Sequence, residues 1–306
     1  MTKEQYLKNL KVPSGRVDVI LDTDAYNEID DQFAISYLLL SGEKLNTVGL
    51  CAAPFFNSLS TGAKDGMEKS YNEILKLLSF LGRDDLKEKT FKGSEQYLPD
   101  EKTPVISDAA RFIVESAKKY TPEDPLYVVA IGAITNVASA ILLDPLAMEN
   151  TVIVWLGGHA MGCDWARGEA SEFNMVQDIA AARVVFGSGA PLVQLPCCGV
   201  VSAFTVSEAE MKYWLLGKNA LCDYLVQHAI DEVTYAKGRP WTRVIWDVTA
   251  VAWLVGDFTA DEIVTAPIPE YDSRYGYGSD RHLMKCVFHV WRDKLFEDLV
   301  KRLTSL

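Results

Sequence analysis

Four aspartates lie within ten residues near the start of the chain. They are Asp22, Asp24, Asp30 and Asp31. Residues 17–22 show the alternation of a strand that leaves a core. Asn27 is placed to cap a helix whose third residue is Asp30, with apolar side chains at helical spacing behind it. The acids are therefore expected to meet where a strand ends and a helix begins.

Four carboxylates in one place repel each other unless a cation neutralises them. Carboxylate oxygens are the ligands that Ca²⁺ and Mg²⁺ prefer. The alternative is a polar turn at Asp22 and Asp24, with Asp30 and Asp31 placed to favour the helix dipole. Their position at the carboxyl end of the first strand of an α/β pattern favours the metal site.

Strand-like and helix-like segments alternate along the chain. Strands are predicted at about 17–22, 46–52, 126–131, 151–155 and 191–195, and helices at about 28–41, 64–81, 106–119, 134–143 and 176–187. After about residue 207 the pattern becomes helical, including an apolar helix at 247–255, and ends with a loop at 270–280, a strand near 284–291 and a helix near 292–304. We expect an α/β fold with an open, mostly parallel sheet flanked by helices, extra C-terminal helices, and one domain spanning residues 1–306.

Composition limits the possible partners. Of the 306 residues, 49% are hydrophobic, enough for a large core, and the net charge of −12 argues against nucleic acid or an anionic membrane as the main partner. The six cysteines form no CxxC pair, which favours reduced thiols. The N-terminus lacks the apolar core of a signal peptide, and no segment has the apolar length of a membrane span. We expect a soluble, cytoplasmic protein.

Three later segments, taken with the opening acids, resemble motifs of a known family in the same order. They are 129–138, the pair 155–158 and 171–182, and 244–252. Together they resemble the inosine–uridine-preferring nucleoside hydrolases over about residues 17–304. The resemblance implies a Rossmann-like fold and a hydrolase that is a glycosidase acting on N-glycosyl compounds in purine salvage. It also implies a small-molecule nucleoside substrate, bound calcium, and a homodimer or homotetramer.

Carried over residue by residue, the resemblance assigns a metal site. Asp24, Asp31, Asp247 and the backbone carbonyl of Ile131 match its calcium ligands. Asp24 also matches the catalytic group that takes a proton from the attacking water. Asp22 matches an aspartate that orients the ligands. An all-oxygen site of this kind leaves Ca²⁺ positions for water and two sugar hydroxyls.

The resemblance also assigns substrate-binding residues. Asp30, Glu172 and Asn174 match groups that hold the ribose hydroxyls, and Asn57 is the candidate replacement for a family asparagine absent after the second strand. Trp246 stands where base-nonspecific members have a histidine that protonates the leaving base. Because an indole is a poor acid but stacks well on a purine, we expect purine nucleosides to be favoured.

Other departures from the family pattern leave alternatives open. Residues 25–28 replace a shorter Pro-Gly turn, and Ala166 replaces a ribose-binding asparagine for which Arg167 or Asp164 could substitute. Protonation of the base is left to solvent or to a distant group, His228, Tyr224 or His282.

Two other classes of protein remain as alternatives. The first is a non-catalytic or altered-substrate nucleoside or ribosyl-binding protein on the same fold. The second is a haloacid-dehalogenase-like phosphatase, which also begins with Asp-x-Asp at a strand end but needs a downstream lysine and a second acidic pair.

Overall fold

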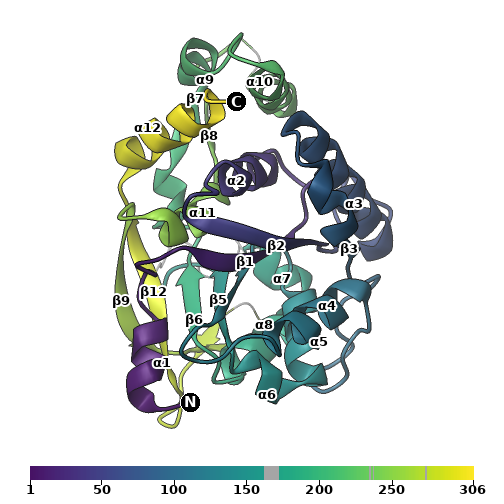
Figure 1. Cartoon of the computed structure of the whole chain (residues 1–306), viewed down its shortest axis with the longest axis vertical. Coiled ribbons are helices and arrows are strands. Elements are labelled where there is room, and N and C mark those ends of the chain that lie inside the picture. The colour runs from purple at the N-terminus through teal and green to yellow at the C-terminus, as the bar shows by residue number, and fades with distance from the viewer. Residues whose placement is uncertain (162–171, 234–235, 237, 273) are drawn as a thin grey trace.

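The apolar segments predicted as strands form one large sheet in the computed structural model, which describes residues 1–161, 172–233, 236, 238–272 and 274–306 (Figure 1). Within these residues, eight strands have the order β3-β2-β1-β4-β5-β6-β12-β9. All neighbouring pairs are parallel except β12 with β9. The strands are β1 (Val17–Thr23), β2 (Leu45–Ala52), β3 (Thr90–Lys92), β4 (Leu126–Ala130), β5 (Thr151–Leu156), β6 (Leu192–Leu195), β9 (Thr259–Thr265) and β12 (Leu283–Val290).

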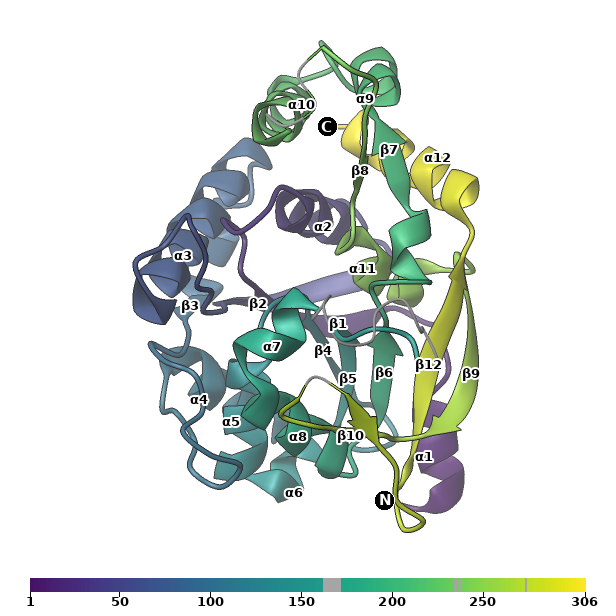
Figure 2. The same ribbon diagram turned by 180° about the vertical axis from the view of Figure 1, so that it is seen from behind.

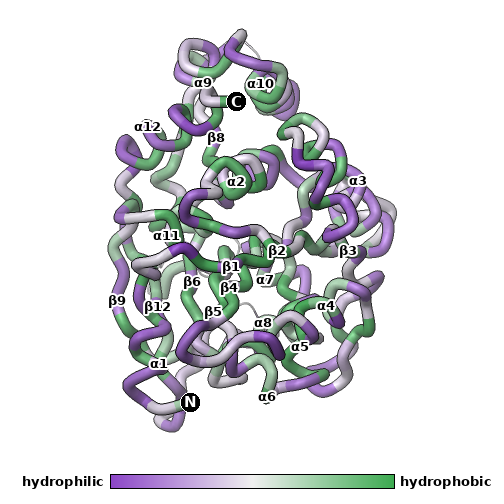
Figure 3. The backbone as a smooth tube through the Cα atoms, viewed as in Figure 1, coloured by the Kyte–Doolittle hydropathy of each residue, from purple (hydrophilic) through white to green (hydrophobic). Residues whose placement is uncertain are grey.

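Alternate residues of the strands bury side chains in two cores, one on each face of the sheet. Val19 and Leu21 belong to one core, and Ile20 between them belongs to the other. Figures 1 and 2 show the helices in two corresponding layers, and Figure 3 shows hydrophobic residues gathered along the inner strands. One layer holds α2 (Asp30–Leu39), α3 (Ala63–Phe80), α11 (Val248–Val255) and α12 (Arg292–Leu303); the other holds α4 (Asp108–Ala117), α5 (Thr135–Leu143) and α8 (Ile179–Gly187).

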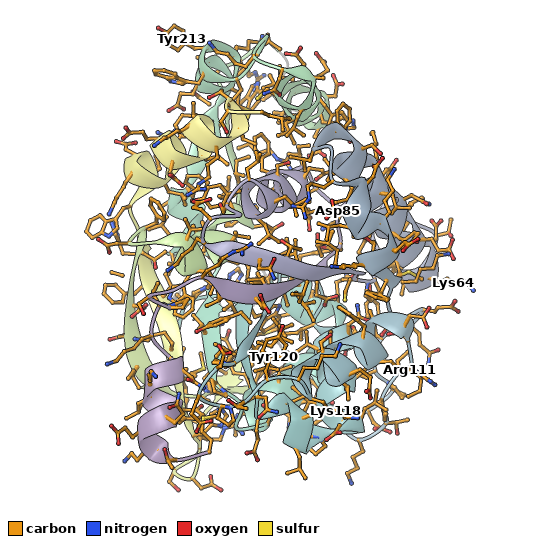
Figure 4. All side chains as sticks on the ribbon, viewed as in Figure 1. Lys64, Asp85, Arg111, Lys118, Tyr120 and Tyr213 are labelled. Carbon is orange, nitrogen blue, oxygen red and sulfur yellow. The ribbon has the colours of Figure 1, made fainter. Side chains whose placement is uncertain are left out.

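The remaining elements are smaller. Helices α9 (Glu208–Trp214) and α10 (Ala220–Glu232) lie beyond α2 at one end of the molecule, and Tyr213 lies at that tip (Figures 1 and 4). An antiparallel pair, β7 and β8, connects this end to the body. The other elements are α1 (Lys3–Asn9), α6 (Pro145–Met148), α7 (Phe173–Gln177), β7 (Thr205–Ser207), β8 (Thr242–Val244), β10 (Ile268–Pro269), β11 (Tyr275–Gly276) and the short 3₁₀ turns at Asp84–Lys89 and Val201–Ala203.

The expected fold class is confirmed. The five strands predicted in the first two thirds of the chain form within one residue of the expected bounds. Several details were wrong. The helix expected at 176–187 is divided at Asp178, whose side chain accepts a hydrogen bond from Ala181 N and caps α8. Strands β3, β7, β8, β9 and β10 were not predicted, and the loop expected at 270–280 contains β11.

The expected cap at Asn27 was also wrong. Helix α2 begins at Asp30 after Ile29, with no side-chain cap. The Asn27 side chain instead accepts a hydrogen bond from Asn57 Nδ2, and the backbone N–H of Asn27 donates to Asp24 O. The first turn of α2 therefore has no side-chain cap. Its acids, Asp30 and Asp31, lie at the end of β1, where Asp31 accepts a hydrogen bond from the Thr23 hydroxyl.

No helix in the described ranges has the length and apolar character needed to cross a bilayer.

Candidate active site

The carboxyl ends of the central strands surround a cavity of about 280 Å³. Parallel pairing brings these ends together: Ile131 N donates to Asp22 O, and Ala53 N donates to Thr23 O. Helix α11 packs against α2, and the first two residues of α2 and Asp247, just before α11, line the same cavity. Its buried lining residues are Asp24, Asp30, Asp31, Ile131, Leu156, Glu172, Asn174, Cys197 and Asp247.

Three carboxylates meet at the bottom of this cavity. Asp30 and Asp31 come from the first turn of α2, and Asp247 precedes α11. One oxygen of each lies within 4.8 Å of the others. Their residues are only 3%, 2% and 3% exposed. This group could hold a metal ion, because it offers several buried oxygens and no sulfur or nitrogen.

The electrostatics of the cluster favour a cation. Burial raises the pKa of Asp247 well above its usual range, and repulsion from Asp30, Asp31 and Asp24 adds to it. Burial likewise raises the pKa of Asp30, Asp24 and Asp31, that of Asp31 to about 7 although it accepts a hydrogen bond from the Thr23 hydroxyl. Asp24 Oδ2 and Asp30 Oδ1 are buried without a hydrogen-bond partner. Orphaned oxygens of this kind are costly and are relieved by a bound ion or water.

Asp24 borders the cavity but does not belong to the group of three. Its carboxylate lies against Gly132, where a Cβ atom would come within 2.7 Å of Asp24 Oδ1. Glycine at this position therefore allows the acid its place. Two of the predicted metal ligands, Asp31 and Asp247, belong to this group. Its third member is Asp30, which had been expected to bind ribose instead.

Asp22 lies behind the cavity, outside its lining. Asn136 Nδ2 donates to Asp22 Oδ1 over 2.8 Å, and Asn136 Oδ1 accepts from Ser94 N. Burial raises the pKa of Asp22 to about 7, and the hydrogen bond from Asn136 lowers it in part. This placement agrees with a role in fixing the end of β1.

Glu172 and Asn174 line the cavity, and both are bonded to backbone. The Glu172 carboxylate caps α7 and accepts from the N–H groups of Gly158, Asn174 and Met175 at 2.6–2.8 Å. Asn174 Nδ2 donates to the carbonyls of Ile131 and Leu156 at 2.9 and 3.0 Å. The carbonyl expected to bind metal, that of Ile131, is thus held by Asn174. Sequence reasoning did not foresee that these groups would be occupied.

Asn57 lies outside the cavity lining. Its Nδ2 donates to Asn27 Oδ1, and Asn27 itself lines the cavity. The structure therefore places Asn57 where it can position Asn27. The candidates Asp164, Ala166 and Arg167 lie outside the described residues.

The mouth of the cavity is formed by partly exposed side chains. Trp246, expected to meet the base, is one of them and packs on the core below. His159, Phe173 and Cys198 also line the mouth and were not predicted there. His159 directly follows Gly157-Gly158, part of a motif that the resemblance placed at the site, and that position was the available signal.

His228, Tyr224 and His282 are absent from the cavity lining in the part of the chain that the structure describes. The rings of His228 and Tyr224 lie 4.4 Å apart on α10. The Tyr224 hydroxyl donates to Glu73, and it accepts from Lys76 Nζ over 2.8 Å. The expectation that one of the three protonates the base finds no support in this placement.

Arg243 is a cation that lies near the acids. Arg243 Nη2 is 2.7 Å from Glu232 Oε2 and 3.5 Å from Glu28 Oε2, and Glu28 is at the cavity. Arg243 lowers the pKa of Asp30, but burial and repulsion from Glu28 outweigh it. The ion pairs connect the loop after β1 to α10.

Comparison with known proteins identifies relatives of this chain. The family model described as inosine-uridine preferring nucleoside hydrolase matches residues 19–280. A probable uridine nucleosidase 2 from Arabidopsis thaliana is 30% identical over 200 residues, which are 58% of each chain. The pyrimidine-specific ribonucleoside hydrolase RihA from Escherichia coli is 29% identical over 140 residues, 44% of this chain and 43% of that protein. The chain thus spans little more than half of the first relative and less than half of the second.

Solved structures share the fold. A plant nucleoside hydrolase superposes with a TM-score of 0.74 at 20% identity, covering 95% of this chain and 99% of that one. A purine-preferring ribonucleoside hydrolase from Gardnerella vaginalis gives a TM-score of 0.74 at 20% identity, covering 94% and 98%. At this identity the likeness establishes the architecture.

Proposed function

The chain belongs to the inosine-uridine preferring nucleoside hydrolase family, and we propose that it hydrolyses the N-glycosidic bond of ribonucleosides to free base and ribose. The observation that carries the proposal is the buried cluster of Asp30, Asp31 and Asp247 beside Asp24 in one cavity. Buried acids with raised pKa values in a cleft are typical of functional sites. Membership of the family removes the phosphatase alternative.

We propose Ca²⁺ as the bound ion. Asp30, Asp31 and Asp247 would hold it, with Asp24 and the Ile131 carbonyl as the further ligands implied by the family resemblance. Ca²⁺ takes six to eight oxygen ligands, so such a site leaves positions for other oxygens. When bound, the ion supplies charge neutralisation, a grip on a vicinal diol and acidification of a bound water.

The reaction needs a base for water. Asp24 is proposed to accept the proton of the water whose oxygen adds to C1′, while the C1′–N bond breaks and its electron pair passes to the base nitrogen. Asp24 Oδ2 has no hydrogen-bond partner in the structure, which leaves that oxygen for the water. Gly132 lies against the Asp24 carboxylate and, having no Cβ, leaves room for it.

The ribose hydroxyls are proposed to be held by Asp30, Glu172 and Asn174. A carboxylate offers about four acceptor sites, and three at Glu172 are taken by backbone N–H groups. The Cys197 thiol also bonds to this carboxylate, so a sugar hydroxyl would compete with the thiol for the remaining site. Asn174 would act through its amide oxygen, because Nδ2 is committed to two carbonyls. We propose that Asn57 acts on the substrate only by holding Asn27.

Purine nucleosides are proposed as the favoured substrates, because the partly exposed Trp246 at the mouth can stack on a larger ring. Named relatives include a probable uridine nucleosidase, a pyrimidine-specific hydrolase and a purine-preferring hydrolase, so the assay must compare both classes of nucleoside. Function as a single-domain homodimer or homotetramer in cytoplasmic purine salvage stays a prediction, which light scattering and cell fractionation can test.

The test is ribose release from a panel of inosine, guanosine, adenosine, uridine and cytidine with Ca²⁺ present. We expect free ribose and base, with purines faster. Binding of nucleosides without turnover would contradict the hydrolase and favour the non-catalytic alternative.

A further inference from the structure

Thr23 is the last residue of β1, and its side chain lies on the face of the sheet that α2 covers. Val19 and Leu21, at alternate positions of the same strand, belong to the core on that face, and side chains of a strand alternate between faces. Helix α2 belongs to the layer on this face (Figure 1). The strand therefore directs the Thr23 hydroxyl toward the first turn of α2, which holds Asp30 and Asp31.

The backbone of Thr23 is fixed by the sheet. Thr23 pairs in register with Ala52 of β2, and its carbonyl accepts a hydrogen bond from Ala53 N over 2.8 Å. The residue is fully buried. Threonine is also branched at Cβ, which restricts its χ1 rotation. The hydroxyl of Thr23 is therefore carried on a rigid support.

This hydroxyl donates a hydrogen bond to Asp31 Oδ1. Asp31 is buried and belongs to the group of three acids that could hold a metal ion. It also shares a side-chain hydrogen bond with Asp247, another member of that group. A hydrogen bond from a rigid donor restricts rotation of the Asp31 carboxylate. It thereby fixes the directions in which the remaining lone pairs of this carboxylate point.

Building on the proposed Ca²⁺ site, we propose that Thr23 is a positioning residue that orients the Asp31 carboxylate for the ion. Thr23 is not among the described residues that line the cavity, so it acts through Asp31 and not on the substrate. Without the hydroxyl, the Asp31 carboxylate must be ordered when the ion binds, which lowers the affinity. Groups that hold the ligands of a metal site in this way contribute about 10–100-fold to metal affinity.

The experiment measures ion affinity independently of turnover, by calorimetric titration of the chelator-treated full chain with Ca²⁺. The variants are Thr23→Val, which keeps the branched shape without a hydroxyl, and Thr23→Ser, which keeps the hydroxyl on an unbranched side chain. Thr151→Val is the matched control. Thr151 is equally buried, and its hydroxyl donates to Met148 O over 2.8 Å at the start of β5, away from the acids. Urea unfolding with chelator shows whether each variant is folded.

We expect Thr23→Val to raise the Kd for Ca²⁺ by about 10–100-fold, because Asp31 is no longer held. The Ca²⁺ concentration that gives half-maximal inosine hydrolysis should rise by the same factor, with kcat near that of wild type at saturating Ca²⁺. Thr23→Ser should give a Kd between those of wild type and Thr23→Val. Thr151→Val should match wild type.

A wild-type Kd in Thr23→Val, or an equal rise in Thr151→Val, would overturn the role of Thr23 alone. A wild-type chain that binds no Ca²⁺ would overturn the proposed metal site and the role of Thr23 with it. The expected order of Kd values in a chain that cleaves no nucleoside would support the role of Thr23 and contradict only the proposed hydrolysis.

Discussion

Replacing Asp31 with asparagine should stabilise the metal-free protein at pH 8 and abolish its response to Ca²⁺. Asp31 is buried in the acid cluster, and burial raises its pKa to about 7. An aspartate in the unfolded chain has a pKa of about 3.9. The folded protein therefore holds this proton more tightly than the unfolded chain. The resulting stability is complete below about pH 4 and is lost as the pH rises through about 7.

The magnitude follows from that difference. Ionised Asp31 costs the folded state on the order of 4 kcal/mol at pH 8. Asparagine does not ionise, and its amide oxygen can still accept from the Thr23 hydroxyl. The substitution should thus remove most of this cost while keeping the local hydrogen bond. Because the other acids of the cluster remain, about 4 kcal/mol is the upper limit of the stability gained by the substitution.

The assay is urea unfolding at pH 5 and pH 8, first with chelator and then with Ca²⁺. We expect wild type to lose stability between the two pH values without metal and to regain it with Ca²⁺, because a ligand that binds only the folded state stabilises it. Asp31→Asn should lose less stability than wild type between the two pH values, because Asp24, Asp30 and Asp247 still titrate with raised pKa values, and it should respond little to Ca²⁺. Asp85→Asn is the control, because the Asp85 side chain is exposed and pairs with Arg83. If Asp31→Asn were no more stable than wild type at pH 8 yet responded to Ca²⁺ as wild type does, the electrostatic account of the cluster would be wrong.

Three further outcomes concern catalysis. Asp24→Asn should lower kcat by about 10²–10⁴ with little change in KM, as loss of a general base does. The measurement is steady-state kinetics on inosine, and a kcat equal to that of wild type would show that Asp24 is not the general base. Ribonucleosides should exceed 2′-deoxyribonucleosides by on the order of 10⁴ in kcat/KM, since buried polar groups read the diol; equal rates on adenosine and deoxyadenosine would exclude Asp30 and Glu172 from ribose binding. Trp246→Ala should lose about 1–3 kcal/mol of purine binding and change uridine less, and undiminished inosine activity would show that Trp246 only packs the core.

The fold was largely predictable because its central strands are apolar throughout and alternate with helical patterns. Segments such as 126–130 and 151–156 have no exposed residue, so their sequences carry an unmixed signal. Strand β9 is different: Thr259–Thr265 is a polar edge strand with mixed exposure, paired on one side with β12. Such a strand owes its conformation to its partner, which local sequence does not reveal.

The site was predictable where topology dictated it. The acids after β1 lie beside the Ile131 carbonyl after β4 because the carboxyl ends of parallel strands share one edge of the sheet. Asp247 follows β8 of the separate antiparallel pair and reaches these acids because α11 packs against α2, so its place was indicated by the family resemblance alone. The mouth was not predictable, because His159 after β5 meets Cys198 after β6 only through the pairing of those strands. The hydrogen bonding of Glu172 was missed because it also depends on the fold: besides capping α7, the Glu172 carboxylate accepts from Gly158 N, 14 residues earlier in the chain.

A catalytic metal held by the buried acids is tested by ribose release from inosine in one sample that is assayed with Ca²⁺, then with chelator, and then with Ca²⁺ restored. We expect turnover, its loss, and its full return, with Asp247→Asn inactive throughout although folded. Undiminished turnover in the chelated sample, or full activity of Asp247→Asn, would contradict a catalytic metal held by the buried acids.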